Sequence, residues 1–286
     1  MPKSIGELVE LLELEEIEIG LYRARQPDTL MQRAFGGQVL AQALSAAART
    51  VEATRTLHSM HGYFLVPGRT DIPIVYDVEQ VRDGRSFSSR RVVARQGGKT
   101  IFYLSASYQI TEDGFDHQDP TPEDVPAPDD CPRYVDILAG LTGREPAIWQ
   151  REYGALDVRF AGDSRPGGAL SDPRHPARAR VWVRVDGRLP DDPRIHQAAL
   201  AYASDLTLLA AATVPHDVFI GGPQVQAASL DHAMWFLRAL RADQWLLYDQ
   251  ISPSASNARG LSTGRLFQDG QLVANVAQEG LIRPAR

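Results

Sequence analysis

The stretch HQAALAYASDLTLLAAA, residues 196–212, decides the fold, because its apolar residues recur with the spacing of a helix and short strand-like runs follow it. The stretch FGGQVLAQALSAAART, residues 35–50, has the same spacing and the same place in its own half of the chain. The strand-like runs after it, separated by Gly or Asp-Gly turn signals, are residues 57–68, 72–84, 86–98 and 99–110. The pattern therefore predicts, twice, a long helix followed by an antiparallel meander.

One constant offset of 172 residues, as from Phe64 to Phe236, relates the two halves. The matching positions are Phe64-Leu65 with Phe236-Leu237, Tyr76-Asp77 with Tyr248-Asp249, and Gly98 with Gly270. Because these strands match without a gap, duplication of one unit explains the agreement better than chance among common strand residues. A sheet curled around a central helix is the hotdog fold. We therefore predict an α+β double hotdog, with two antiparallel sheets each wrapped around a long central helix.

The segment between the halves has neither helical nor strand periodicity. Residues 111–133, TEDGFDHQDPTPEDVPAPDDCPR, concentrate proline and acidic residues, which is typical of a connector. We therefore predict an N-terminal hotdog unit at residues 1–111, a Pro/acid-rich linker at 112–150, and a C-terminal hotdog unit at 151–286. The third of these would carry the functional site.

Composition excludes several classes of protein. The chain has 286 residues, of which 43% are hydrophobic, so it is long enough to bury a substantial core. The formal charge of −6 argues against a nucleic-acid partner. The single cysteine, Cys131, excludes an intrachain disulfide framework and fits a cytoplasmic location. Glutamates interrupt the apolar positions of residues 1–20, so we expect neither a signal peptide nor a membrane partner.

Three polar residues of the C-terminal half stand where apolar residues are expected. Asp205 has only apolar residues three and four positions away along the predicted helix, so its charge needs a partner or a purpose. At the offset of 172, Ser229 faces Leu57 and Gln278 faces Ala106. Each residue taken alone also has an ordinary explanation as a hydrogen-bonded polar group, and Asp205 is the most informative of the three. Together, a carboxylate, a hydroxyl and an amide are able to hold and deprotonate a water molecule.

The sequence resembles the type II acyl-CoA thioesterase family over essentially its whole length. The stretches that carry the resemblance are FGGQVLAQAL from Phe35, LHSMHGYFLVPG from Leu57, YDVEQVRDGRSFSSRRV from Tyr76, VPHDVF from Val214, SLDHAMWF from Ser229 and VANVAQEGLIR from Val273. The resemblance implies hydrolysis of acyl-CoA thioesters to free fatty acid and CoA, with CoA as part of the substrate and no metal or other cofactor. It also implies assembly into a homo-oligomer, a dimer or a tetramer.

The family's catalytic trio of Asp, Thr or Ser, and Gln falls on Asp205, Ser229 and Gln278. The middle residue is often Thr in the family and is Ser here, which keeps the hydroxyl but frees its χ1 rotation. Two alternatives remain open at this point. One is a hotdog enoyl-CoA hydratase, which would use a histidine base, and the other is an acyl-CoA-binding sensor without catalysis.

Other residues are candidates for substrate binding. Arg82, Arg85, Arg90 and Arg91 form a run that either clamps CoA phosphates or covers a solvated strand edge. Gly36 and Gly37 would let a polarised carbonyl approach the start of the first helix, although close packing also explains small residues there. His58 either borders the site or is a satisfied core histidine.

One motif is set aside. GLSTG, residues 260–264, matches a nucleophile elbow by pattern, but Ser262 precedes a predicted hairpin where an elbow requires a helix. Asp231 and His232 are likewise no catalytic pair, because adjacent strand residues point to opposite faces.

Overall fold

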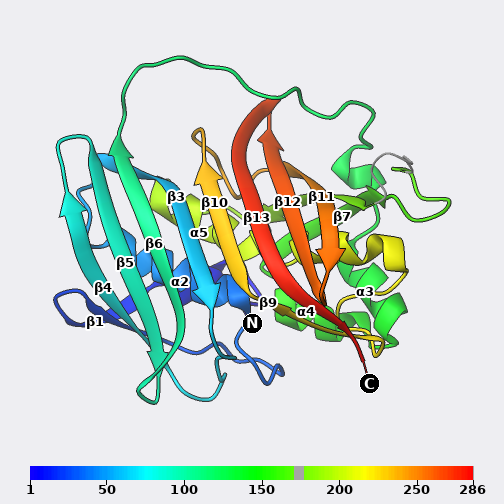
Figure 1. Cartoon of the computed structure of the whole chain (residues 1–286), viewed down its shortest axis with the longest axis horizontal. Coiled ribbons are helices and arrows are strands. Elements are labelled where there is room, and N and C mark those ends of the chain that lie inside the picture. Colours follow the sequence, from blue (N-terminus) through cyan, green and yellow to red (C-terminus); the bar gives the residue numbers. More distant parts are fainter. Residues whose placement is uncertain (171–176, 286) are drawn as a thin grey trace.

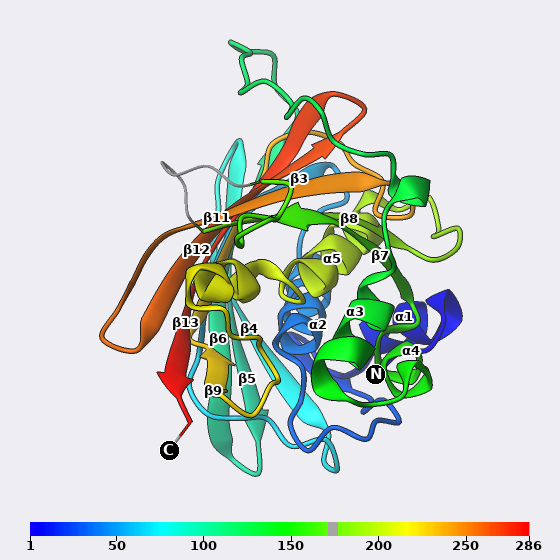
Figure 2. The same cartoon turned by 90° about the vertical axis from the view of Figure 1, so that its right-hand side faces the viewer.

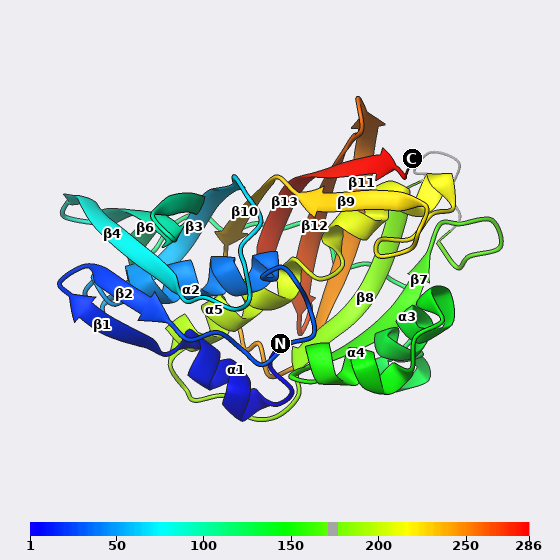
Figure 3. The ribbon, with the colours of Figure 1, turned by 90° about the horizontal axis from the view of Figure 1, so that it is seen from below.

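The computed structural model describes residues 1–170 and 177–285. Two helices, α2 (Gly36–Ala48) and α5 (Pro193–Ser204), pack together against the concave face of a curved antiparallel sheet (Figures 1 and 2). Seen from below, α2 and α5 cross the middle of the molecule beneath the strands, and the shorter helices lie on the side away from the sheet (Figure 3). These are α1 (Ile5–Leu12), α3 (Tyr134–Thr142) and α4 (Pro146–Tyr153).

The strands fall into two groups along the chain. Those of the N-terminal half are β1 (Leu14–Glu18), β2 (Leu21–Ala24), β3 (Arg55–Phe64), β4 (Ile74–Asp83), β5 (Phe87–Gln96) and β6 (Lys99–Ile110). Those of the C-terminal half are β7 (Leu156–Asp163), β8 (Arg178–Val185), β9 (Val225–Ser229), β10 (Asp231–Phe236), β11 (Leu246–Ser256), β12 (Arg259–Gln268) and β13 (Gln271–Pro284).

The sheets of the two halves join edge to edge into one sheet. Its strand order is β1-β2-β4-β5-β6-β3-β10-β13-β12-β11-β8-β7, and β9 pairs with β13 beside this path. The predicted α+β hotdog architecture is confirmed, with one difference from the two sheets that were expected. β3 pairs with β10 in a register that sets Met60 opposite Met234, so neither strand keeps an open edge.

The repeat holds for the strands but not for the helices. β5 at 87–96 and β12 at 259–268 are separated by the predicted offset, whereas Pro193 of α5 lies 157 residues after Gly36 of α2. The helix offset is shorter than the strand offset because the 3-10 helix η2 (Leu208–His216) and the loop before β9 lie between α5 and the strands that follow it. The prediction of one helix through residues 196–212 was therefore wrong. Asp205 is the C-cap of α5, and short polar side chains such as Asp205 and Thr207 favour such breaks.

The predicted linker at 112–150 is a connector only in its first part. Its extended portion arches over one end of the sheet (Figure 1), where Arg265 contacts Asp119 at 3.0 Å and Gln118 donates to the Gly270 carbonyl at 2.8 Å. Its second part contains the short 3-10 helix η1 (Pro128–Asp130), α3 and the beginning of α4. Helix α4 crosses the predicted boundary and ends at Tyr153.

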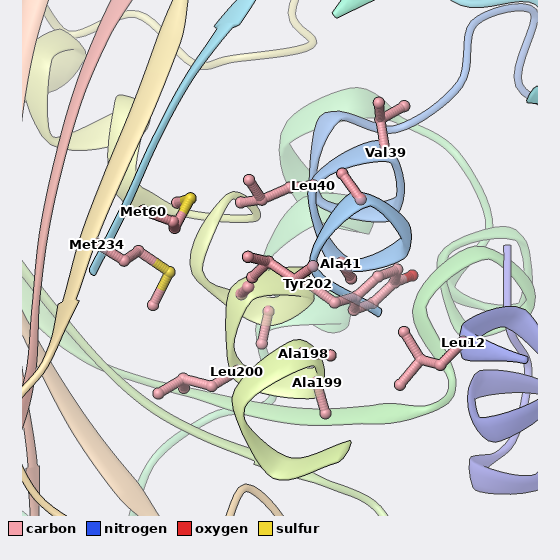
Figure 4. Packing of buried hydrophobic residues seen from close by; sticks show 14 of the residues in the cluster. Leu12, Val39, Leu40, Ala41, Met60, Ala198, Ala199, Leu200, Tyr202 and Met234 are labelled. Atoms are coloured by element: carbon pink, nitrogen blue, oxygen red, sulfur yellow. The ribbon is translucent and has the colours of Figure 1, made fainter. Parts of the chain in front are cut away.

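The core lies between the helix pair and the central strands. Met60 and Met234 point from β3 and β10 toward Leu40 and Leu200 (Figure 4). Small residues allow α2 and α5 to approach closely, and at Gly37 any Cβ would overlap the carbonyl oxygen of Tyr202. The segment Pro193–His216 is long and apolar enough to cross a membrane, but 78% of its most apolar window is buried inside the protein. Packing in this core accounts for that composition.

Candidate active site

The three residues singled out from the sequence lie within hydrogen-bonding distance of one another. Gln278 Nε2 donates to Asp205 Oδ1 at 2.5 Å and to Ser229 Oγ at 2.8 Å. The Ser229 hydroxyl donates to Asp205 Oδ1 at 3.1 Å. A helix end, a short strand and the last strand therefore bring a carboxylate, a hydroxyl and an amide to one point.

Local structure explains why these side chains converge. Asp205 follows the last residue of α5, so its side chain leaves the helix beside the sheet. On β13, Gln278 faces inward together with Val276 and Ala274, as strand alternation requires. Ser229 ends β9 and pairs with Gly280, which places it next to Gln278 on the neighbouring strand.

The hydrogen bonds fix the orientation of the Gln278 amide. An ionised carboxylate only accepts hydrogen bonds, so Gln278 must present its NH2 group to Asp205. Both donors from the trio reach Oδ1, and the other carboxylate oxygen faces the first residue of α2. A Cβ added at Gly36 would lie 2.5 Å from Asp205 Oδ2. Oδ2 is thus the oxygen that the trio does not use.

An apolar cavity of about 450 Å³ opens beside Asp205 and Gly36. Asp205, Ser229 and Gly36 contribute to its wall, whereas the fully buried Gln278 lies behind them. Most of the lining is apolar and includes Phe35, Val39, Phe64, Val66, Ile101, Phe102, Leu206, Leu209 and Ile220. A cavity of this kind fits an apolar ligand with a polar group at the end beside Asp205.

Burial makes Asp205 a weaker acid than an exposed aspartate. Burial raises the pKa of Asp205 to about 6, and hydrogen bonds from Gln278, Ser229 and the Gly37 amide act in the opposite direction. The sequence left open which of these effects is larger, and in the structure it is burial. A carboxyl group that titrates near neutral pH is suited to accept a proton from water.

Gly36 lines the cavity and the Gly37 amide bonds to Asp205, so substrate binding by these two glycines stays a prediction. His58 does not line the cavity. The His58 ring lies 2.8 Å from the Ser107 hydroxyl through Nε2, and its edge packs on Phe87. Along β3, His58 is six residues from Phe64, which does line the cavity, or about 20 Å at the rise of a strand. His58 is therefore no neighbour of the carboxylate, and its predicted contact with the site is a correction.

The four arginines also lie away from the cavity. Arg90 is buried and donates to Asp83 at 2.8 and 3.1 Å and to the Thr50 hydroxyl at 2.8 Å. Thr50 follows the C-terminal end of α2, whereas Asp205 lies at its N-terminal end, about 20 Å away for a helix of 13 residues. Arg90 is already committed to these bonds, so it is not available to a phosphate.

The other three arginines are on the surface of the β4–β5 hairpin. Arg91 comes within 4.0 Å of Glu79, and Arg82 and Arg85 are exposed. A phosphate clamp formed by all four residues is therefore a correction, because Arg90 is bound elsewhere. Binding of CoA phosphates by Arg82, Arg85 and Arg91 stays a prediction.

Two residues near the site escaped the sequence analysis. Tyr153, at the end of α4, lines the cavity and packs edge-on against Phe35. His232 on β10 is fully buried, with Nδ1 3.7 Å from Asp205 Oδ1. Asp231 and His232 do point to opposite faces, as expected, but the inward face is the one that meets Asp205. Alternation with Met234 was the signal that could have placed His232 there.

Within residues 1–170 and 177–285, no group of three His, Cys, Asp or Glu side chains is placed to hold a metal ion.

Comparison with known proteins assigns the family. A family model described as acyl-CoA thioesterase matches residues 169–281, and one described as its N-terminal domain matches residues 26–109. Acyl-CoA thioesterase 2 of Haemophilus influenzae is 38% identical over 287 residues, covering 99% of both chains. The chain belongs to the type II acyl-CoA thioesterase family. Membership makes it a thioester hydrolase.

Other members of the family agree with this assignment. Human acyl-coenzyme A thioesterase 8 is 38% identical over 288 residues, which cover 96% of this chain and 88% of the human one. The crystal structure of an acyl-CoA thioesterase II, TesB2, from Mycobacterium marinum superposes with a TM-score of 0.82 at 42% identity, covering 97% of each chain. Both similarities span the N-terminal and the C-terminal halves, so the family's double-hotdog architecture applies to the whole chain.

Proposed function

We propose that the protein hydrolyses acyl-CoA thioesters to free fatty acid and CoA by direct attack of a water molecule that Asp205 activates. One observation carries the proposal: a buried carboxylate that titrates near neutral pH lies at the polar end of an apolar cavity, with Ser229 and Gln278 bound to it. Hydrolysis by this route needs neither a nucleophilic side chain nor a covalent intermediate.

In the proposed reaction, the attacking water lies between Asp205 and the thioester carbonyl carbon. Asp205 takes a proton from this water while the water oxygen forms a bond to the carbonyl carbon. Ser229 and Gln278 orient the carboxylate and the water by hydrogen bonds. When the carbon–sulfur bond breaks, the proton returns from Asp205 to the departing CoA thiolate, so one water is divided between the acid and the thiol.

The start of α2 is the proposed binding place for the negative charge that develops on the carbonyl oxygen. Phe35, the N-cap of α2, provides no side-chain cap. The Gly37 amide bonds to Asp205 and the Gln38 amide to the Phe35 carbonyl, so the Gly36 N–H is the first-turn group proposed to receive this charge. The helix dipole also favours negative charge at this end. Gly36 and Gly37 lack side chains that would keep the carbonyl at a distance.

The cavity supports hydrolysis over the alternative of hydration. An enoyl-CoA hydratase would need a histidine base in contact with substrate, and His232 is fully buried and does not line the cavity. We therefore place the acyl chain in the apolar cavity, with the thioester carbonyl at Gly36 and Asp205.

A free-thiol release assay with medium-chain and long-chain acyl-CoAs tests the proposal. We expect turnover by the wild-type protein and by Asp77→Asn, an exposed control, and loss of turnover in Asp205→Asn. Undiminished hydrolysis by folded Asp205→Asn would refute the role of this carboxylate. Binding of acyl-CoA without thiol release by the wild type would instead support the sensor, and water addition to crotonyl-CoA would support the hydratase.

Three further properties belong to the proposal. We propose that the reaction needs no metal or other cofactor, so the rate should survive treatment with a chelator. A homo-oligomer, dimer or tetramer, stays a prediction that light scattering coupled to chromatography will check. The cytoplasmic location likewise stays a prediction, and cell fractionation tests it.

A further inference from the structure

His232 is a buried titratable residue that the proposed reaction does not use. Its side chain is 0% exposed, and its Nε2 lies 2.9 Å from Ser204 Oγ. Nδ1 has no hydrogen-bond partner and points toward Asp205, with Oδ1 3.7 Å away. A buried ring nitrogen without a partner is uncommon in folded proteins and calls for an explanation.

We propose that His232 is a positioning residue for Asp205, presenting an Nδ1–H group to Oδ1 while Ser204 holds the opposite side of the ring. The inference rests on the proposed function and extends it to the residue that fixes the base. His232 does not touch substrate, because it does not line the cavity.

The tautomer follows from the groups on the two sides of the ring. The single proton of the Ser204 hydroxyl goes either to the Ala201 carbonyl oxygen at 3.0 Å or to Nε2 at 2.9 Å. When it goes to Nε2, the imidazole proton is on Nδ1. With the other tautomer, the Nδ1 lone pair would face an ionised carboxylate, and two acceptors would repel each other. Burial lowers the pKa of His232 to about 3, so the ring stays neutral while Asp205 titrates.

The separation of 3.7 Å is longer than a hydrogen bond but short enough for a small shift to close it. Hydrogen bonds of catalytic groups are often long without substrate and shorten in the reactive complex. Shortening this contact as substrate fills the cavity would hold the Asp205 carboxylate with Oδ2 toward the water.

Ser204, His232 and Asp205 have the atom order of a nucleophilic triad, but Ser204 is not placed to attack a substrate. Its side chain is 1% exposed and is absent from the cavity wall. The hydroxyl also lies 3.0 Å from the Ala201 carbonyl oxygen and 3.4 Å from Met234 Sδ. The serine therefore anchors the imidazole.

The other groups around Asp205 do not change their charge in the pH range in which Asp205 titrates. Tyr153 on α4 and Tyr248 on β11 interact with its charge, and burial raises the pKa of both phenols, so they remain neutral. Ser229, Gln278 and the Gly37 amide donate hydrogen bonds and do not titrate. No arginine or lysine of the described residues forms an ion pair with Asp205.

Three substitutions separate the two sides of the ring. His232→Asn keeps an amide nitrogen close to the position of Nδ1, and His232→Gln keeps one close to that of Nε2. His232→Phe keeps neither. We expect the acid limb of the kcat profile, which lies near pH 6 in the wild type, to stay in place in His232→Asn. In His232→Phe and His232→Gln it should move up by about one pH unit, lowering kcat about fivefold near pH 6 and little above about pH 8.

A role limited to packing gives a different result. It would lower kcat by the same factor at every pH, and His232→Asn would not rescue the profile. Equal acid limbs in the wild type and folded His232→Phe overturn the inference. Complete loss of turnover in Ser204→Ala, with an acyl group trapped on wild-type Ser204, would also overturn it, because the serine would then be a nucleophile.

A second measurement does not depend on activity. The ¹⁵N chemical shifts of wild-type His232 report which nitrogen carries the proton, and we expect Nδ1. The ¹³C shift of the Asp205 carboxyl, assigned by its absence in Asp205→Asn, should titrate at higher pH in His232→Phe. These readings decide the inference even if the wild-type protein hydrolyses no acyl-CoA, an outcome that would count only against the proposed function. A proton on Nε2 would refute the positioning role.

Discussion

Gly36 lies so close to Asp205 that a Cβ at the glycine would come within 2.5 Å of the carboxylate oxygen Oδ2. Phe64 blocks the other direction, since its ring carbons would be 3.1 and 3.3 Å from the same Cβ. The absence of a side chain at this position therefore keeps open the space that the water and the thioester would occupy.

Gly36→Ala should accordingly lower kcat/KM by between about fivefold and about 150-fold, because a shift of the carboxylate or of Phe64 costs on the order of 1–3 kcal/mol. The fold should persist, since neither neighbour is backbone. Gly114→Ala is the matched control, because a Cβ there meets nothing within 4 Å. Thiol release measured alongside the melting temperature checks the prediction, and an alanine variant with wild-type kcat/KM contradicts it.

The raised pKa of Asp205 implies that the site lowers stability at neutral pH. The folded protein holds this carboxyl at a pKa of about 6, against about 3.9 in an unfolded chain. Between these values the folded state binds more protons than the unfolded state, so this contribution to the free energy of unfolding falls as pH rises through the window.

Asp205→Asn removes this titration. As pH rises from about 4 to about 7, the free energy of unfolding of the variant should increase relative to that of the wild type by on the order of 2–3 kcal/mol. Denaturant unfolding of both proteins at several pH values measures this difference. The contributions of the other ionisable groups are the same in both proteins, so they cancel in the difference. A difference that is flat with pH would show that Asp205 is not held at a raised pKa.

Much of the site was readable from the sequence because strand alternation is local. Gln278 and Ser229 stood out where the first half keeps Ala106 and Leu57, and the strand offset that exposed them holds in the structure. Asp205 was found for a partly incorrect reason. It was taken for the middle of a helix, and it is a C-cap, because a turn and a 3-10 segment continue the apolar spacing of α5.

What the sequence could not give depends on which surfaces meet in three dimensions. The edge-to-edge pairing of β3 with β10 joins the two predicted sheets, and no local pattern specifies it. The same holds for His232, which meets Asp205 only once α5 lies against β10. His58 and Arg90 were wrong for the opposite reason, since residue type suggested a role although both side chains are bound to other residues in the fold.

The position of the arginines leads to a contrast between two neighbouring residues. Arg91 is exposed, and its ion pair with Glu79 is long at 4.0 Å. Arg91→Ala should therefore change KM for acyl-CoA by no more than about twofold and the free energy of unfolding by no more than about 1 kcal/mol. Arg90→Ala should destabilise the protein by several times that amount, because it removes the hydrogen bonds that the buried guanidinium donates to the hydroxyl and carbonyl oxygens of Thr50 and to Asp83. Steady-state kinetics and denaturant unfolding distinguish the two. A large rise in KM for Arg91→Ala would restore a phosphate-binding role to this hairpin.

The duplication provides a matched pair for the strongest stability prediction. Asp77 and Asp249 occupy equivalent repeat positions, but their surroundings differ. Asp249 is 2% exposed and accepts from Arg180 at 2.6 Å and from Arg265 at 2.7 Å, whereas Asp77 is exposed and 3.7 Å from Arg95. Burial alone would raise the pKa of Asp249, but the two guanidinium groups together hold it below its usual value.

Asp249→Asn leaves two arginines without their shared anion, one of them nearly buried, and should cost about 3–5 kcal/mol of unfolding free energy. Asp77→Asn should cost less than about 1 kcal/mol. Because the folded pKa of Asp249 is lowered, its contribution is present above about pH 4 and is lost as pH falls below that value, so the gap between the two variants should narrow in acid. Urea unfolding at neutral and at acidic pH measures both effects. Equal losses in the two variants would mean that the repeat position, rather than burial between Arg180 and Arg265, determines what the aspartate contributes.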